Sequence, residues 1–168
     1  KKFIRSIYKY KVYKLFIQIE RKNMNLHMGL DVGSTTVKLV VTDDSFNTIY
    51  SVYTRHKSDV RETVKKVLKD ASEKFKDDRV TVAVTGSGGM FLADIIETDF
   101  VQEVIAETRA IKEFIPETDV LIELGGEDSK ITYLSGSVEQ RMNSICAGGT
   151  GAFIDQMASL LDTDALGL

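Results

Sequence analysis

The chain has 168 residues, of which 43% are hydrophobic and 28% are charged. This length allows one domain with a hydrophobic core, and no apolar run approaches the roughly 20 residues that cross a bilayer. The single cysteine excludes an internal disulfide and is typical of a protein from the reducing cytoplasm.

Positive charge is concentrated at the start of the chain. Residues 1–23 hold eight of the 22 Lys and Arg residues and one of the 25 acidic residues, so the remainder is acidic. An acidic body is a poor candidate for binding nucleic acid, and we expect no such partner. The basic segment fits a helix on a membrane surface or a secretory signal, but lysines interrupt its apolar residues. We expect instead that the fold begins at Met24, that residues 1–23 lie outside it, and that no membrane is bound.

The predicted elements follow from the period of the apolar residues and from turn residues between them. In chain order they are strands at 26–32, 36–43 and 48–55, a helix at 58–76, a strand at 80–84, a helix at 90–96, a short strand at 99–101, a helix at 103–115, strands at 119–124, 130–134 and 137–142, and a helix at 150–161. This order predicts an α/β fold in which helices flank a mixed sheet.

Several details of these elements can be predicted as well. Ser58 is the expected N-cap of the helix at 58–76. Pro116 is expected to end the helix at 103–115. The strand at 119–124 is expected to be buried. The helices at 103–115 and 150–161 are expected to pack apolar side chains inward: Val104, Ile105, Ala110, Ile111 and Phe114 on the first, and Phe153, Ile154, Met157, Leu160 and Leu161 on the second.

The first candidate site lies between the first two predicted strands. It consists of Asp31, the turn residues Gly33, Ser34, Thr35 and Thr36, and Lys38. Glycine lets the backbone approach a phosphate, and consecutive amides and hydroxyls donate to its oxygens. A carboxylate at a strand end can hold Mg²⁺ through water. The alternative is an ordinary hairpin with polar residues.

The second candidate site repeats this arrangement between two later strands. Glu123 precedes a turn of Gly125, Gly126, Glu127 and Asp128. Two such hairpins in one domain could bind phosphates from both sides, and the pair is a more specific signal than either alone. The alternative is two unrelated hairpins.

Two glycine-rich segments remain. Segment 85–89 could be a phosphate loop, but it lacks the Gly-Lys-Ser/Thr ending of a P-loop and could equally be a flexible loop. Cys146 precedes a helix, whose N-terminus favours the thiolate that binds iron. A buried inert thiol is the alternative, and one cysteine cannot hold a cluster alone. His27 and His56 are interpreted as structural.

The segments 31–38, 85–89, 123–128 and 146–151, in this order, resemble the activators of 2-hydroxyacyl-CoA dehydratases and the related BadF/BadG-type ATPase subunits of benzoyl-CoA reductase. The run CAGGTGAFIDQMA, which starts at Cys146, is the most specific part. The resemblance implies the actin/sugar-kinase fold, with ATP between two related halves. Residues 24–168 would then be the ribonuclease H-like first half, truncated at its C-terminal end and inactive alone.

The resemblance also implies a chemistry. Such a protein is a homodimer that holds one [4Fe-4S] cluster between its subunits and uses ATP hydrolysis to drive a low-potential electron to the dehydratase or reductase of an anaerobic pathway. A ferredoxin or flavodoxin would supply the electron. Asp31 and Glu123 match the Mg²⁺-side carboxylates, the two turns match the ATP phosphate hairpins, and Cys146 matches the first cluster cysteine.

The sequence departs from the family pattern at several positions. Glu123 stands where Asp is usual, Gly148 where Ala is common, and Glu127 where Gln is usual, although Glu127 could still orient the attacking water. There is no second cysteine and no adenosine-binding half. Two other functions remain open: a sugar or acyl kinase of the same fold, which would not need Cys146, and a non-enzymatic actin-like ATP-binding module, which would need neither Cys146 nor Glu127.

Overall fold

The computed structural model of the chain describes residues 24–126, 128–143, 151–163 and 167. Its elements in chain order are β1 (Asn25–Val32), β2 (Thr36–Thr42), β3 (Thr48–Arg55), α2 (Val60–Lys74), β4 (Arg79–Thr85), α3 (Gly89–Ile95), β5 (Asp99–Phe100), α4 (Glu103–Phe114), β6 (Val120–Leu124), β7 (Ser129–Tyr133), β8 (Glu139–Met142) and α5 (Gly151–Leu160). Within these residues, none of the helices is long and apolar enough to cross a membrane.

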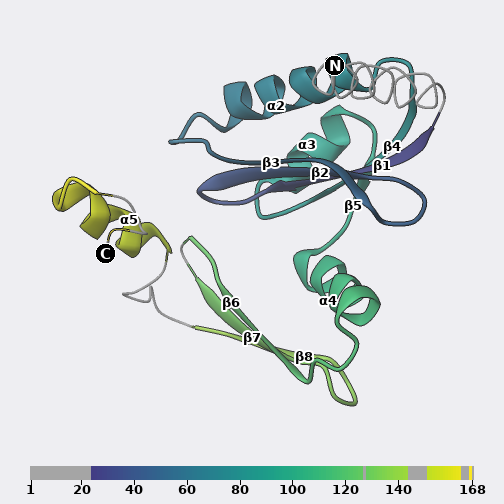
Figure 1. The fold of residues 1–168 in the computed structure, drawn as a ribbon. Coiled ribbons are helices and arrows are strands. Elements are labelled where there is room, and N and C mark those ends of the chain that lie inside the picture. Colours follow the sequence, from purple (N-terminus) through teal and green to yellow (C-terminus); the bar gives the residue numbers. More distant parts are fainter. Residues whose placement is uncertain (1–23, 127, 144–150, 164–166, 168) are drawn as a thin grey trace, which may run out of the picture.

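The first five strands form one mixed sheet in the order β3-β2-β1-β4-β5 (Figure 1). Strand β1 pairs antiparallel with β2 and parallel with β4, and the outer pairs continue these two directions. The mixed sheet predicted from the order of strands and helices is therefore confirmed.

One face of this sheet carries the hydrophobic core. Side chains alternate along each strand, so every second residue of β1, β2 and β4 points to the same face. The buried core residues are Leu26, Met28, Leu30, Val32, Val37, Leu39, Val41, Val64, Val67, Ala71, Phe75, Val84 and Ala93. Helices α2 and α3 cover this face (Figure 1), so the opposite face is free to present polar side chains.

The last three strands form a separate antiparallel sheet in the order β6-β7-β8. Helix α4 lies between the two sheets (Figure 1) and contacts both sides. At its start, Lys130 Nζ on β7 lies 2.5 Å from Glu103 Oε2, and at its end the Phe114 ring packs edge-on against Phe46 in the β2–β3 turn. Helix α4 thus connects the second sheet to the first.

The first long helix begins later than predicted, and its N-cap is Asp59 rather than Ser58. The Asp59 carboxylate accepts a hydrogen bond of 3.3 Å from the backbone N of Glu62. Lys57 and Ser58 both have positive φ angles, of 47° and 67°, so the chain makes a left-handed bend there and Ser58 cannot cap the helix.

The predicted burial of the later elements is wrong. On β6, Ile122 is 67% exposed and Leu124 is 68% exposed. Helix α4 has no buried residue, and on α5 Phe153 and Leu160 are exposed. Val104 and Ile111 on α4 and Ile154 and Met157 on α5 are half-buried, so the described residues cover these apolar faces only in part.

Candidate functional site

The first predicted turn joins β1 to β2 at the edge of the open sheet face. It is closed by a hydrogen bond of 2.9 Å from Gly33 N to the Thr36 carbonyl. Directly behind it, Asp31 and Lys38 are paired across the two strands, and Lys38 Nζ lies 2.7 Å from Asp31 Oδ2. Both side chains are about a third exposed, so they are accessible to a ligand.

The second predicted turn has the same construction. Gly125 N donates to the Asp128 carbonyl at 2.8 Å. Behind this turn, Glu123 and Lys130 are paired across β6 and β7, and Lys130 Nζ lies 3.3 Å from Glu123 Oε2. Sequence reasoning missed Lys130, although its signal is visible: the lysine follows the carboxylate at the same spacing as Lys38 follows Asp31.

The fold brings the tips of the two turns together. A Cβ atom added to Gly126 would lie 2.6 Å from Thr35 Oγ1 and 3.0 Å from Ser34 Oγ. Real Cβ contacts are longer, so a larger residue at position 126 would force the side chains of Thr35 and Ser34 to move. The two hairpins, which lie far apart in the sequence, therefore form one site.

The N-terminus of α5 adjoins the second turn. The backbone N atoms of Gly151 and Ala152 donate to the carbonyls of Gly125 and Gly126, at 2.9 and 2.8 Å. These bonds satisfy two of the amides that a helix N-terminus leaves without an intrahelical partner. They also fix the turn against the helix that follows Cys146 in the sequence.

The glycine-rich segment 85–89 is packed against the first turn rather than free. Gly86 has a φ of 94°, and a Cβ there would lie 2.4 Å from the Val32 carbonyl oxygen and 2.5 Å from Asp31 Oδ1. Gly88 N donates to the same Val32 carbonyl at 2.8 Å. Thr85, paired with Asp31 across the sheet, has a buried Oγ1 without a hydrogen-bond partner among the described residues.

A charged cluster surrounds Glu123. Burial lowers the pKa of Lys130, but its hydrogen bond to Glu103 and the charge of Glu123 outweigh burial and raise it overall. Burial also raises the pKa of Glu107 on α4 to about 7, and its hydrogen bond to Glu123 adds to the shift. Glu123 therefore faces the carboxylates of α4 as well as the lysine.

The predicted Mg²⁺-side carboxylates, Asp31 and Glu123, each lie behind one of the two turns, and their role stays a prediction. No group of three or more His, Cys, Asp or Glu side chains among the described residues could hold a metal ion. Mg²⁺ commonly binds through one or two carboxylates together with water and substrate phosphates, and Asp31 beside the first turn fits that description. Each of the two carboxylates already pairs with a lysine, Asp31 with Lys38 and Glu123 with Lys130. Glu127 and Cys146 lie outside the described residues.

The two histidines have different surroundings. His27 is half exposed and contacts Thr81 and Asp44, at 2.8 and 3.0 Å. His56 is buried, and its Nε2 lies 3.3 Å from the carbonyl oxygen of Gly33 in the first turn. No sequence motif marks His56, because the contact arises from the pairing of β3 with β2.

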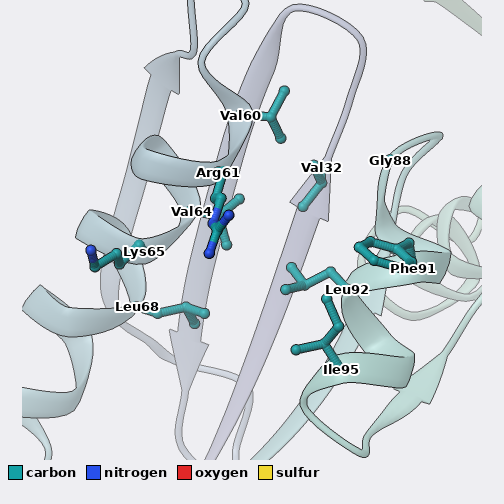
Figure 2. A pocket seen from close by; sticks show the side chains of 10 residues that line it. All are labelled: Val32, Val60, Arg61, Val64, Lys65, Leu68, Gly88, Phe91, Leu92 and Ile95. Atoms are coloured by element: carbon teal, nitrogen blue, oxygen red, sulfur yellow. The ribbon is translucent and has the colours of Figure 1, made fainter.

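An apolar cavity of about 790 Å³ lies on the other face of the first sheet, between α2 and α3 (Figure 2). Its lining residues are Val32, Val60, Arg61, Val64, Lys65, Leu68, Gly88, Phe91, Leu92 and Ile95. Because Val32 and Asp31 point to opposite faces of β1, this cavity is separate from the site at the two turns.

The chain is 31% identical to the 2-hydroxyisocaproyl-CoA dehydratase activator of Clostridioides difficile, over 82% of this chain and 53% of that protein. It is 30% identical to the (R)-2-hydroxyglutaryl-CoA dehydratase activating ATPase of Acidaminococcus fermentans, over 80% of this chain and 53% of that protein. The solved structure of the Clostridium difficile activator with bound ADPNP matches with a TM-score of 0.68 and 29% identity, over 83% of this chain and 53% of that chain.

The chain thus spans about half the length of the curated relatives it matches. These likenesses confirm the predicted fold class, a mixed sheet flanked by helices, as in the dehydratase activators of the actin/sugar-kinase fold. The BadF/BadG/BcrA/BcrD ATPase family model matches residues 28–166. Together with the identity to two dehydratase activators, this match shows that the chain belongs to the BadF/BadG/BcrA/BcrD ATPase family.

Proposed function

We propose that this chain supplies the phosphate-binding part of an ATP-dependent activator of a 2-hydroxyacyl-CoA dehydratase-type enzyme. The observation that carries the proposal is the meeting of two turns of the same construction, where Gly126 lies against Ser34 and Thr35. Membership in an ATPase family and the likeness to an activator solved with bound ADPNP support ATP as the ligand.

The residues of the first turn bind and orient the phosphates in this proposal. The hydroxyls of Ser34, Thr35 and Thr36 are of the type that donates to phosphate oxygens, and Gly33 lets the backbone come close to them. Lys38 neutralises negative charge, and Asp31 holds Mg²⁺ through water.

The second turn approaches the phosphates from the opposite side. Gly125 and Gly126 allow close approach of the backbone, and Asp128 accepts the bond that closes the turn. Glu127 orients the attacking water. Glu123 acts as a second Mg²⁺-side carboxylate if its bond with Lys130 is released.

The redox part of the proposal rests on Cys146 and on the family. Cys146 would be one of the four cysteine ligands of a [4Fe-4S] cluster, so a homodimer would need one more cysteine in each subunit besides Cys146. Low-potential electron transfer to the dehydratase or reductase partner is the chemistry that this cluster would supply. A ferredoxin or flavodoxin would reduce it, and the single cysteine is consistent with action in the cytoplasm.

ATP hydrolysis tests the first part of the proposal. In the full-length protein, Asp31→Ala should reduce Mg²⁺-dependent turnover by about 100-fold or more, because a positioned metal contributes several kcal/mol to the transition state. Asp70→Ala, an exposed position on α2, is the matched control and should leave turnover unchanged. Undiminished turnover in Asp31→Ala would remove Asp31 from the site.

Iron binding tests the second part and separates it from the kinase alternative. The full-length protein, reconstituted with iron and sulfide without oxygen, should bind one cluster per dimer. Cys146→Ser should abolish that cluster and leave ATP binding intact. If the serine variant keeps its iron and its electronic spectrum, Cys146 is no ligand and a kinase becomes the better interpretation.

A further inference from the structure

His56 makes three contacts around the first turn, and together they join β3 to the turn. Its ring is buried, with 6% of the residue exposed. Ring Nε2 lies 3.3 Å from the Gly33 carbonyl oxygen, ring Nδ1 lies 3.2 Å from Ser58 N, and the backbone N donates to the Thr35 carbonyl at 3.2 Å. Two of the turn's carbonyl groups are therefore held by one residue.

These partners determine the tautomer of the ring. The Ser58 amide can only donate, so Nδ1 must offer its lone pair. The Gly33 carbonyl can only accept, so Nε2 must carry the hydrogen. A neutral imidazole protonated at Nε2 satisfies both contacts, and the opposite tautomer satisfies neither.

The contact with Gly33 also fixes a donor on the other side of the same peptide. In a trans peptide the C=O and the following N–H point in opposite directions, and the described residues contain no cis peptide bond. By holding the Gly33 carbonyl, the His56 ring fixes the direction of the Ser34 amide. Gly33 N is bonded to Thr36 at the same time, so the turn is held at both ends of its first residue.

We propose that His56 is a positioning residue for the first turn, whose Nε2–H orients the Ser34 amide toward a phosphate of the bound nucleotide. This inference rests on the proposed function, since it takes the turn to be a phosphate site. The Thr35 contact uses the backbone of residue 56, so any residue there could make it. The specific role of the side chain is the bond to Gly33.

Three substitutions separate the two ring contacts. In His56→Gln the side-chain amide N can replace Nε2 and donate to Gly33, but nothing replaces Nδ1. In His56→Asn the side-chain oxygen can replace Nδ1 and accept from Ser58, but nothing reaches Gly33. His56→Phe keeps the buried volume and loses both bonds, while all three variants keep the backbone contact with Thr35.

Binding of Mg²⁺·ATP and of AMP to the chain, measured by calorimetry, provides the test. The Phe and Asn variants should bind ATP about three- to tenfold more weakly, the effect of one neutral hydrogen bond. The Gln variant should stay within about twofold of the wild type. AMP should bind much more weakly than ATP to the wild type and to every variant, because AMP lacks the phosphates beyond the first. Equal ATP affinity in all variants, or rescue by Asn and not by Gln, would overturn the inference.

Amide hydrogen exchange keeps the inference testable without a nucleotide. The Gly33 amide should be protected in the wild type and in His56→Gln, and should lose protection in His56→Asn and His56→Phe. Unchanged protection in the Asn variant overturns the role of His56, even if the Phe variant fails to fold. A wild-type chain that binds AMP as well as ATP would contradict the proposed function instead, and the exchange result would still decide the role of His56.

Discussion

The half-buried carboxyl group of Glu107 gives the stability of this protein a specific dependence on pH. Burial, reinforced by its hydrogen bond to Glu123, raises the pKa of Glu107 from 4.5 to about 7. The folded chain therefore binds this proton more tightly than the unfolded chain does. The contribution of Glu107 to the free energy of unfolding should be largest below about pH 4.5 and should fall as the pH rises to about 7. Above about pH 7 it should stay level.

The size of the effect follows from the two pKa values. At 1.36 kcal/mol for each pH unit, the difference corresponds to about 3 kcal/mol, and partial exposure of the group reduces this to about 1–3 kcal/mol. Glu107→Gln mimics the protonated form at every pH. The variant should therefore match the wild type near pH 5 and exceed its stability by about 1–3 kcal/mol near pH 8.

Urea unfolding of both proteins at several pH values measures this difference, because other titrating groups cancel in the comparison. Glu113→Gln, an exposed position on the same helix, is the matched control and should show the same pH dependence as the wild type between about pH 5 and 8. Parallel profiles for the wild type and Glu107→Gln would show that Glu107 is not held in a buried, acid-rich environment.

Three further predictions concern stability. Lys130→Met should lower the free energy of unfolding in urea by about 2 kcal/mol. This is less than the roughly 3–5 kcal/mol typical of a broken buried pair, because the two glutamates that contact Lys130 are about a third exposed. Gly86→Ala should cost well over the roughly 1 kcal/mol of Gly136→Ala, because both have positive φ but only Gly86 has backbone within 3 Å of the added Cβ; equal losses would contradict the packing of segment 85–89. A chain that begins at Met24 should melt at the same temperature as one that includes residues 1–23, and a loss of cooperative melting would show that the basic segment is structural.

The positions of the strands along the chain could be predicted because their sequences leave little choice. Segments such as 36–42 and 80–84 are rich in β-branched residues, and turn residues separate them. In the first sheet every second residue of β1 is buried against the core. Local preference and global packing agree there, and in such regions sequence reasoning succeeds.

Burial could not be predicted for the second sheet and its helices. A periodic pattern identifies which face of an element is apolar, but it does not say whether another element covers that face. Ile122 and Leu124 share an apolar face of β6 that no described residue covers. The same limit explains why several residues expected to point inward on α4 and α5, such as Phe114 and Leu160, are exposed.

The candidate site was predictable in its parts but not in its assembly. Both glycine turns are visible in the sequence, and so is the equal spacing that would have identified Lys130. The contact between Gly126 and Thr35, and that between His56 and Gly33, join segments that are far apart in the chain. Such contacts depend on strand pairing and sheet packing, which no local pattern encodes.

Each turn has a carboxylate that is already bound to a lysine, and this constrains how a metal can enter. Asp31 bonds Lys38 at 2.7 Å and Glu123 contacts Lys130 at 3.3 Å, so Mg²⁺ must compete with a cation for either carboxylate. Nucleotide phosphates change this balance, because they attract the lysine and also ligate the metal. Mg²⁺ alone should therefore bind weakly, and ATP should increase its affinity by at least about tenfold, a coupling of 1.4 kcal/mol. Calorimetric titration of Mg²⁺ with and without ATP measures this coupling. Lys38→Met should strengthen binding of Mg²⁺ alone, because it frees Asp31. An unchanged Mg²⁺ affinity in this variant would show that Lys38 does not compete with the metal for Asp31.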